Sequence, residues 1–199
     1  MIIETERLIL RPFKKEYASD LFEYLHEPLV NCFACMKLET LDDAKKKLEE
    51  RVKEKEYLFA IVLKENNKVI GEIEAYPETG EPHSNENTPK DTFSPCWMLN
   101  KNYHRKGYAY EAAHAFFDYL FKQKGARRIY AYTEDYNIAS QRLCEKLGMR
   151  KEGLFKEFVS FVKNEDGSPK YENTYQYAIL KKNGNKKIIR KNKCIKKVF

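Results

Sequence analysis

The feature that most constrains this chain is a long amphipathic segment that begins just after a glycine in a basic loop. Its apolar residues recur at intervals of three and four, which is the spacing of one helix face packed against a sheet. They are Ala109, Ala112, Ala113, Phe116, Phe117, Leu120 and Phe121. Gly125 ends the predicted helix, and a strand-like run that ends at Leu99 precedes the loop. A strand, a short loop and a helix in this order predict helices packed on a sheet.

Periodicity divides the rest of the chain into further strands and helices. Thr40 and Asp43 form a start signal like a capping box, with Asp in place of Glu, for the second helix. The order β-α-α-β-β-β-α-β-α-β-β predicts a mixed sheet with helices on its faces, in one domain over residues 1–182. The predicted strands span 3–11, 57–63, 68–76, 92–99, 128–133, 155–162 and 171–180, and the predicted helices span 14–26, 41–52, 109–121 and 138–147.

Two segments lie outside this pattern, a long loop at residues 76–92 and a basic tail at residues 183–199. The formal net charge is +7, but nine Lys or Arg residues and no acid lie from residue 181 onward. The rest of the chain holds 28 basic residues against 30 acidic ones, so it is nearly neutral. Such a tail is usually solvated, so nucleic acid is not the expected partner. Contact of the tail with RNA, a ribosome or an acidic membrane is the alternative.

The cysteines and the apolar runs exclude several classes of protein. Five cysteines without a repeated framework indicate reduced thiols rather than disulfides. Cys32 and Cys35 form a CxxC pair, but no second pair follows, so we expect no metal site. No apolar run approaches the ~20 residues that span a bilayer, and charges interrupt the N-terminus before a signal peptide could form. We therefore expect a cytoplasmic protein with no membrane partner.

The loop after Leu99 has the composition of an anion-binding site. The first N–H groups of a helix are unpaired, and the helix dipole favours negative charge beside them. Gly107 permits a backbone conformation that other residues rarely adopt, while Arg105 and Lys106 add positive charge suited to a pyrophosphate. The loop lacks both the P-loop pattern and the three glycines of a dinucleotide-binding fold. From spacing alone, an anion site and an ordinary basic loop are equal alternatives.

Four segments together resemble the GNAT superfamily of N-acetyltransferases. Residues 104–109, HRKGYA, resemble its acetyl-CoA signature (Gln/Arg)-x-x-Gly-x-(Gly/Ala), although His104 departs from the first position. Residues 107–112, GYAYEA, and residues 5–12, TERLILRP, resemble segments of the ribosomal-protein acetyltransferase subgroup. Residues 137–149 resemble its N-x-x-S and EKLGF elements. The matches stand in the family's order and cover about residues 2–182.

The resemblance implies the GNAT acyl-CoA N-acyltransferase fold, an α+β structure. Its central sheet is mixed, mostly antiparallel and twisted, with about seven strands and about four flanking helices. The strands before the basic loop and after the long helix splay apart, and the pantetheine of acetyl-CoA enters the gap. A backbone N–H near Leu99 then faces the thioester oxygen, and such a donor is worth about 3 kcal/mol in the transition state. The implied cofactor-binding residues are Met98, Leu99, His104, Arg105, Lys106, Gly107, Tyr108, Ala109, Asn137 and Ser140. Asn137 is interpreted equally well as the N-cap of the following helix.

The reaction that the resemblance implies is direct attack of a neutral amine on the thioester. Free amines have a pKa of about 8 to 10.4, so a base or a desolvating pocket is needed. Glu72, on the strand at 68–76, is the candidate for this base. Glu111, His104 and His83 are alternatives, although an acid in the first turn of a helix is more often a partner of the dipole.

The leaving thiolate needs a proton donor or must depart unaided. Many members of the family carry a Tyr for this role at the position where this chain has Cys144. Ser140 is therefore the candidate donor, with water or unassisted departure as alternatives.

The sequence does not specify the acetyl acceptor. We expect a primary amine, on a protein N-terminus or on a small molecule. Its pocket should involve the first two helices, residues 32–37 and the loop 76–92. The alternative is a non-catalytic module that binds acyl-CoA, or that docks on a ribosome or RNA through the basic tail. A homodimer is a further expectation left open, since dimers are common in the subgroup.

Overall fold

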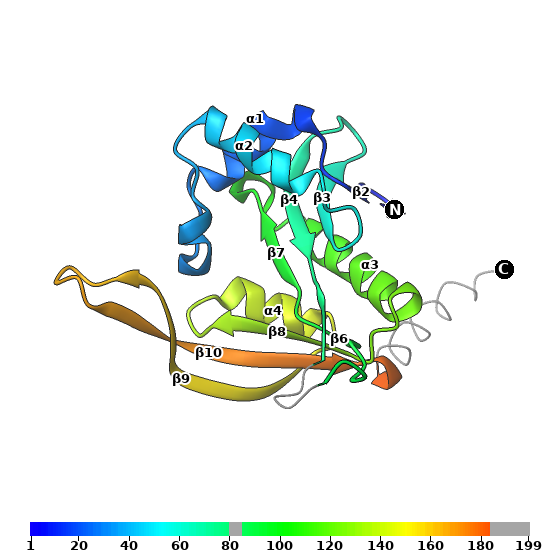
Figure 1. Cartoon of the computed structure of the whole chain (residues 1–199), viewed down its shortest axis with the longest axis vertical. Helices are drawn as coiled ribbons and strands as arrows, with labels where there is room; N and C mark the ends of the chain where they lie inside the picture. Colours follow the sequence, from blue (N-terminus) through cyan, green and yellow to red (C-terminus); the bar gives the residue numbers. More distant parts are fainter. Residues whose placement is uncertain (80–84, 184–199) are drawn as a thin grey trace.

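The computed structural model describes residues 1–79 and 85–183. His83 and the basic tail from residue 184 onward lie outside these residues. Within them the chain forms two five-stranded sheets with helices on their faces (Figure 1). The α+β architecture predicted from the sequence is confirmed.

The first sheet is antiparallel throughout and is built mainly from the N-terminal half of the chain. The strand predicted at 3–11 is divided in two, because Thr5 turns the chain: its amide donates to the Leu8 carbonyl, and its hydroxyl oxygen accepts from the Leu8 amide. In spatial order the strands are β1 (Ile3–Glu4), β2 (Leu8–Arg11), β3 (Leu58–Leu63), β4 (Val69–Glu74) and β7 (Cys96–Leu99).

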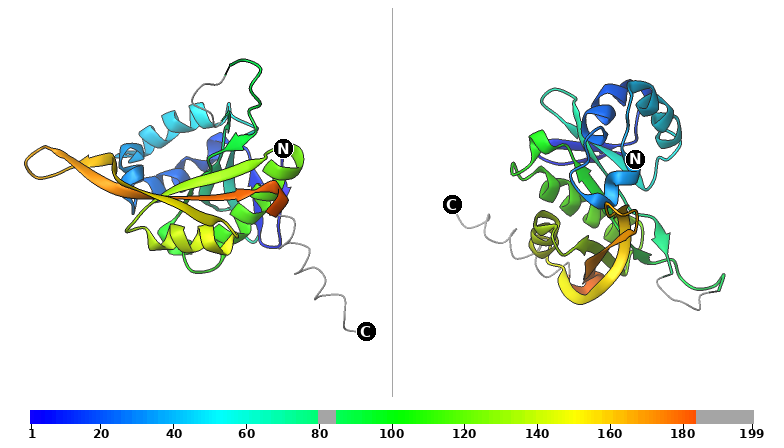
Figure 2. Two further views of the ribbon diagram at one scale, coloured as in Figure 1. Left: turned by 90° about the horizontal axis from the view of Figure 1, so that it is seen from below. Right: turned by 90° about the vertical axis from the view of Figure 1, so that its left-hand side faces the viewer.

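The second sheet contains the C-terminal strands and ends in a long hairpin. The loop predicted at 76–92 includes a short strand of this sheet, and the last two strands are longer than predicted. Their hairpin projects beyond the rest of the described chain (Figure 2). In spatial order the strands are β5 (Pro77–Glu78), β6 (Thr92–Phe93), β8 (Arg128–Glu134), β10 (Pro169–Leu180) and β9 (Arg150–Lys163).

The two sheets separate between β6 and β7. Thr92 and Phe93 pair in parallel with the start of β8, whereas β7 leaves and pairs with β4. The single strand predicted at 92–99 is thus two strands, since Pro95 between them has no N–H for a ladder. Gly71 allows β7 to approach β4, because a Cβ there would lie 2.2 Å from the Met98 carbonyl oxygen. The expected splay between the strand before the basic loop and the strand after the long helix is therefore present.

Helices cover both faces of this arrangement (Figure 1). The helices α1 (Ala18–Leu25) and α2 (Leu41–Arg51) pack on one face of the first sheet around a core that includes Leu21, Leu48 and Val62. On the other face, α3 (Tyr108–Gln123) buries the predicted apolar stripe, and α4 (Ile138–Lys146) lies against β8 and β9. Short 3₁₀ helices are η1 (Lys15–Tyr17), η2 (Asn31–Met36) and η3 (Lys101–Tyr103).

The predicted helix boundaries agree closely with these elements. Thr40 caps α2 through its side chain, and the Asp43 carboxylate returns a bond to the Thr40 amide, so the capping box with Asp is confirmed. Among the described residues, no helix is long and apolar enough to cross a membrane.

Candidate functional site

The turn that joins β7 to α3 leaves its amides without a side-chain cap. Gly107 is the N-cap of α3 with φ 86°, and Arg105 is also left-handed, with φ 61°. No described side chain caps the helix, which is 16 residues long. Its first N–H groups therefore stand at the positive end of a helix dipole, beside the exposed side chains of Arg105 and Lys106. This arrangement suits a bound pyrophosphate.

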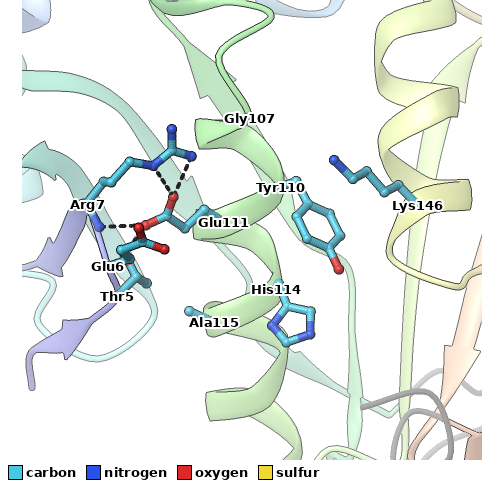
Figure 3. Close-up of a pocket in the computed structure, with 9 residues that line it drawn as sticks. All are labelled: Thr5, Glu6, Arg7, Gly107, Tyr110, Glu111, His114, Ala115 and Lys146. Atoms are coloured by element: carbon cyan, nitrogen blue, oxygen red, sulfur yellow. Dashed lines mark hydrogen bonds and ion pairs between the residues drawn. The ribbon is translucent and has the colours of Figure 1, made fainter. Parts of the chain in front are cut away.

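A clamp from the N-terminal strands holds this turn in place. The Arg7 guanidinium donates to the Lys106 carbonyl at 3.0 Å and forms an ion pair with Glu111 at 2.7 Å (Figure 3). Thr5 donates to the same carboxylate at 2.6 Å. Partial burial alone would raise the pKa of Glu111, but the bonds from Thr5 and Arg7 outweigh it and leave this pKa lowered. Glu111 is thus engaged by the clamp, in agreement with its interpretation as a helix-start partner rather than a base.

The clamp connects two segments that lie 104 residues apart in the sequence. Residues 5–12 and 107–112 both resemble the ribosomal-protein subgroup, and their contact is the Arg7 and Glu111 pair. On the side of α3 away from Arg7, Tyr110 and Lys146 face each other, with the Lys146 ammonium 4.4 Å from the ring centroid (Figure 3). A pocket lined by residues from both sides, including Gly107 and His114, lies along the start of α3.

The gap between β7 and β8 has unpaired strand edges. Within the described strands, β7 is the last strand of its sheet, and β8 pairs with β6 only at Arg128 and Ile129. The side chains of Met98 and Leu99 pack into the two cores, so it is the backbone of β7 that faces the gap. His104 bonds through its ring to the Leu99 carbonyl at 2.9 Å, which ties the basic loop to the end of β7.

The start of α4 reaches β7 across this gap. The Asn137 side chain accepts from the Ser140 amide at 3.2 Å, so Asn137 is the N-cap of α4, as one of its two interpretations required. The Ser140 hydroxyl accepts from the Trp97 indole at 3.2 Å. Ser140 therefore lies beside the strand along which the resemblance places the pantetheine. Cys144 is fully buried, and burial raises the pKa of its thiol to about 12.

Glu72 occupies a different environment from the one a base requires. Its carboxylate is 4% exposed and accepts from Arg51 and from the Tyr24 hydroxyl, each at 2.7 Å. One oxygen is thus held in a buried ion pair with α2, and the other accepts a hydrogen bond from α1.

Glu74 is a second acid on this strand, and no sequence motif singles it out. It lies two residues further along β4 on the same face, opposite Cys96 of β7. Burial raises its pKa, the charge of Glu72 adds to the effect, and Arg51 opposes it. No described residue donates a hydrogen bond to it. The alternation of strand residues could have indicated Glu74, since it shares a face with Glu72.

The CxxC pair lies in η2. Cys32 is half-buried in η2 and Cys35 is exposed. In residues 1–79 and 85–183, no group of three or more His, Cys, Asp or Glu side chains is placed to hold a metal ion.

Comparison with known proteins agrees with this geometry. Residues 7–150 match the family described as acetyltransferase (GNAT) domain. The N-acetyltransferase YnaD of Bacillus subtilis (strain 168) is 32% identical over 185 residues, which cover 93% of this chain and all of that protein. A GNAT-family acetyltransferase from Bacillus anthracis has a similar structure, with a TM-score of 0.76 and 30% identity over 92% of this chain and 99% of the other.

A solved structure from the ribosomal subgroup shares the fold. It is described as the ribosomal-protein-S5-alanine acetyltransferase of Vibrio fischeri. The TM-score is 0.66, with 21% identity over 91% of this chain and 97% of that one. At this identity the likeness concerns the fold alone.

Proposed function

We propose a reaction for this chain from one premise, namely that it belongs to the GNAT acetyltransferase family. The chain is an acetyltransferase, and enzymes of this family use acetyl-CoA as co-substrate. The proposal is that it transfers the acetyl group to a primary amine, on a protein N-terminus or on a small molecule. The observation that carries this is the uncapped start of α3 beside the splayed strands β7 and β8.

The residues present fit acetyl-CoA at this place. The amides at Gly107, Tyr108 and Ala109, with Arg105 and Lys106, would hold the pyrophosphate, because they combine free donors with positive charge. The free edge of β7 would pair with the pantetheine, and Ser140 would lie along it. When bound, acetyl-CoA supplies an acetyl group activated as a thioester.

Glu74 is the base in this proposal. The nitrogen of the neutral amine loses one proton as the amide forms, and a carboxylate with a raised pKa accepts that proton more readily than an ordinary one. The new bond joins the amine nitrogen to the acetyl carbon, the carbon–sulfur bond breaks, and the amine proton passes to Glu74. The pairing of Glu74 with Cys96 puts the carboxylate beside the same strand that borders the gap.

Ser140 is the proposed donor of a hydrogen bond that stabilises the departing thiolate. Its oxygen accepts a bond from Trp97, and this leaves the hydroxyl hydrogen to donate. Cys144 does not serve in its place, because it is fully buried. A non-catalytic acyl-CoA-binding module is the second candidate function, and the same burial of Cys144, where many relatives carry a Tyr, favours it.

An acetyl-transfer screen tests the proposal. The full chain is mixed with acetyl-CoA and a panel of amines and peptides with free N-termini, and thiol release is followed. We expect release that depends on the acceptor. Binding of acetyl-CoA without transfer to any acceptor would favour the non-catalytic module instead.

A further inference from the structure

We propose that the acceptor carries a second positive charge, which Glu134 and Glu172 bind while its reactive amine faces Glu74. This inference rests on the proposed function and names the class of acceptor. It concerns the region where the end of β8, the middle of β10 and η2 come together, on the face of the second sheet opposite α4.

The two carboxylates lie on one face of the second sheet. Glu134 ends β8, and its cross-strand neighbour on β10 is Thr174. Glu172 lies two residues before Thr174 on the same strand, so all three side chains share a face. The η2 helix lies over this face, because Asn31 donates to the Glu172 carboxylate through its side chain.

Neither carboxylate has a cationic partner among the described residues. Both are 6% exposed. Glu172 accepts only from neutral donors, the amide of Asn31 and the hydroxyl of Tyr136, the latter at 3.1 Å. Glu134 likewise accepts only from donors that carry no charge, the Cys32 thiol and, at 3.5 Å, the Asn137 amide. Buried carboxylates are normally paired, so two without a cation indicate a charge that arrives from outside.

A second polar group at the same place has no partner. The Thr174 hydroxyl is buried, with 3% of the residue exposed, and makes no hydrogen bond to any described residue. Because Thr174 stands directly opposite Glu134, its unpaired oxygen lies beside a carboxylate that has no cationic partner. An ammonium has three N–H donors, and it would satisfy both acceptors together. This orphaned hydroxyl is independent of the acidic residues and points to the same kind of ligand.

The acidic region lies near Cys96, the residue of β7 that pairs with Glu74. Burial raises the pKa of the Cys96 thiol to about 12. The charges of Glu74, Glu72 and Glu134 also raise this pKa, whereas the charge of Arg51 lowers it. Cys96 thus lies within the field of acids from both sheets, between β4 and the end of β8. An acceptor with two cationic groups could reach Glu74 with one and Glu134 with the other.

Exposed aromatic rings continue the same face of the sheet. Tyr132 lies two residues before Glu134 and is 43% exposed. Its ring is 5.5 Å from that of Phe158, which is 49% exposed, and Phe155 lies 5.0 Å from Phe158. Aromatic faces attract cations and also cover aliphatic chains. The chemistry of the surface therefore fits ammonium groups separated by an aliphatic spacer, as in a diamine or in a peptide with Lys beside a free N-terminus.

A matched pair of acceptors tests this inference. Butylamine and 1,4-diaminobutane have the same chain length and differ in the second charge. With the full chain and acetyl-CoA, we expect kcat/KM for the diamine to exceed that for butylamine by about tenfold or more, the effect of about 1.4 kcal/mol of extra binding. Peptides that start Ala-Lys and Ala-Ala form the second arm, and the larger charge effect in one arm distinguishes a small polyamine from a protein N-terminus.

Variants test whether Glu134, Glu172 and Thr174 cause the preference for doubly charged acceptors. Glu134→Gln and Glu172→Gln should each reduce the preference severalfold, and Thr174→Val, which keeps the shape of the side chain, should reduce it less. Glu165→Gln, in the exposed turn of the β9–β10 hairpin, is the control and should leave it intact. The rise in melting temperature with acetyl-CoA shows whether each variant is folded and binds the co-substrate.

Three results would overturn the inference. They are equal turnover of the singly and doubly charged acceptors, an unchanged preference in the Glu134 and Glu172 variants, or no turnover of any doubly charged acceptor while acetyl-CoA binds. Failure of acetyl-CoA to bind at all would instead contradict the proposed function.

Discussion

The two ends of the gap between β7 and β8 are built in different ways. The end at Gly107 is made of consecutive residues, with free amides, two basic side chains and a left-handed glycine at a helix start. The end at Glu134 is made of side chains from β4, β8, β10 and η2, which are far apart in the chain. The first end offers positive charge and the second offers negative charge. We infer that one end suits an anionic co-substrate and the other a cationic acceptor.

The largest expected effect is on the free energy of unfolding, and it concerns the buried ion pair between Arg51 and Glu72. Glu72→Gln leaves Arg51 buried without a charge partner, and loss of one member of such a pair costs about 3–5 kcal/mol of unfolding free energy. Urea denaturation measures this loss. Glu65→Gln, on an exposed turn, is the control. A fully stable Glu72→Gln variant whose activity alone was lost would return Glu72 to the role of base.

The next expected effect is confined to the rate of acetyl transfer to the acceptor. Glu74→Gln removes the proposed base, so we expect kcat/KM for the acceptor to fall by about 100-fold, within the usual range for a general base. Affinity for acetyl-CoA should stay the same, since Glu74 lies away from the turn at Gly107. Steady-state kinetics and calorimetric titration separate the two quantities. Retained activity would remove Glu74 from the mechanism.

A smaller effect is expected on the affinity for acetyl-CoA. Arg7→Ala removes the bond to the Lys106 carbonyl and the pair with Glu111, so the turn loses its clamp. We expect acetyl-CoA affinity to fall by about tenfold, which corresponds to about 1.4 kcal/mol. Lys64→Ala, which breaks another pair with an N-terminal strand, is the control and should not change the affinity. Equal affinities for the two variants would show that the clamp does not position the turn.

Sequence reasoning succeeded where the information is local. The stripe on α3, the Thr40 cap and the order of strands follow from spacing within short windows, and the resemblance supplied the splay of the strands. It could not find the clamp between Arg7 and Glu111, because their contact spans 104 residues of sequence. It proposed Glu72 and did not consider Glu74, and no pattern along β4 reveals which of the two acids Arg51 on α2 engages.

The residues proposed to bind the acceptor were the hardest to predict from the sequence. Segment 32–37 was expected to contribute, and η2 does lie over the end of the second sheet. Glu134 and Glu172 carry no motif, and they become neighbours only because β8 and β10 pair in one register. Buried carboxylates without a cation can be recognised only after burial and partners are known.

The most direct test of the central claim is calorimetric titration of acetyl-CoA into the wild type, Gly107→Glu and Gly125→Glu. Both glycines are left-handed and lie at opposite ends of α3, so the backbone strain of substitution is matched. Only Gly107→Glu puts bulk and negative charge at the proposed pyrophosphate site. We predict that the wild type and Gly125→Glu bind acetyl-CoA, and that Gly107→Glu loses at least about 100-fold in affinity, or about 2.7 kcal/mol. Equal affinity in Gly107→Glu and the wild type would contradict the assignment of this turn as the acetyl-CoA site.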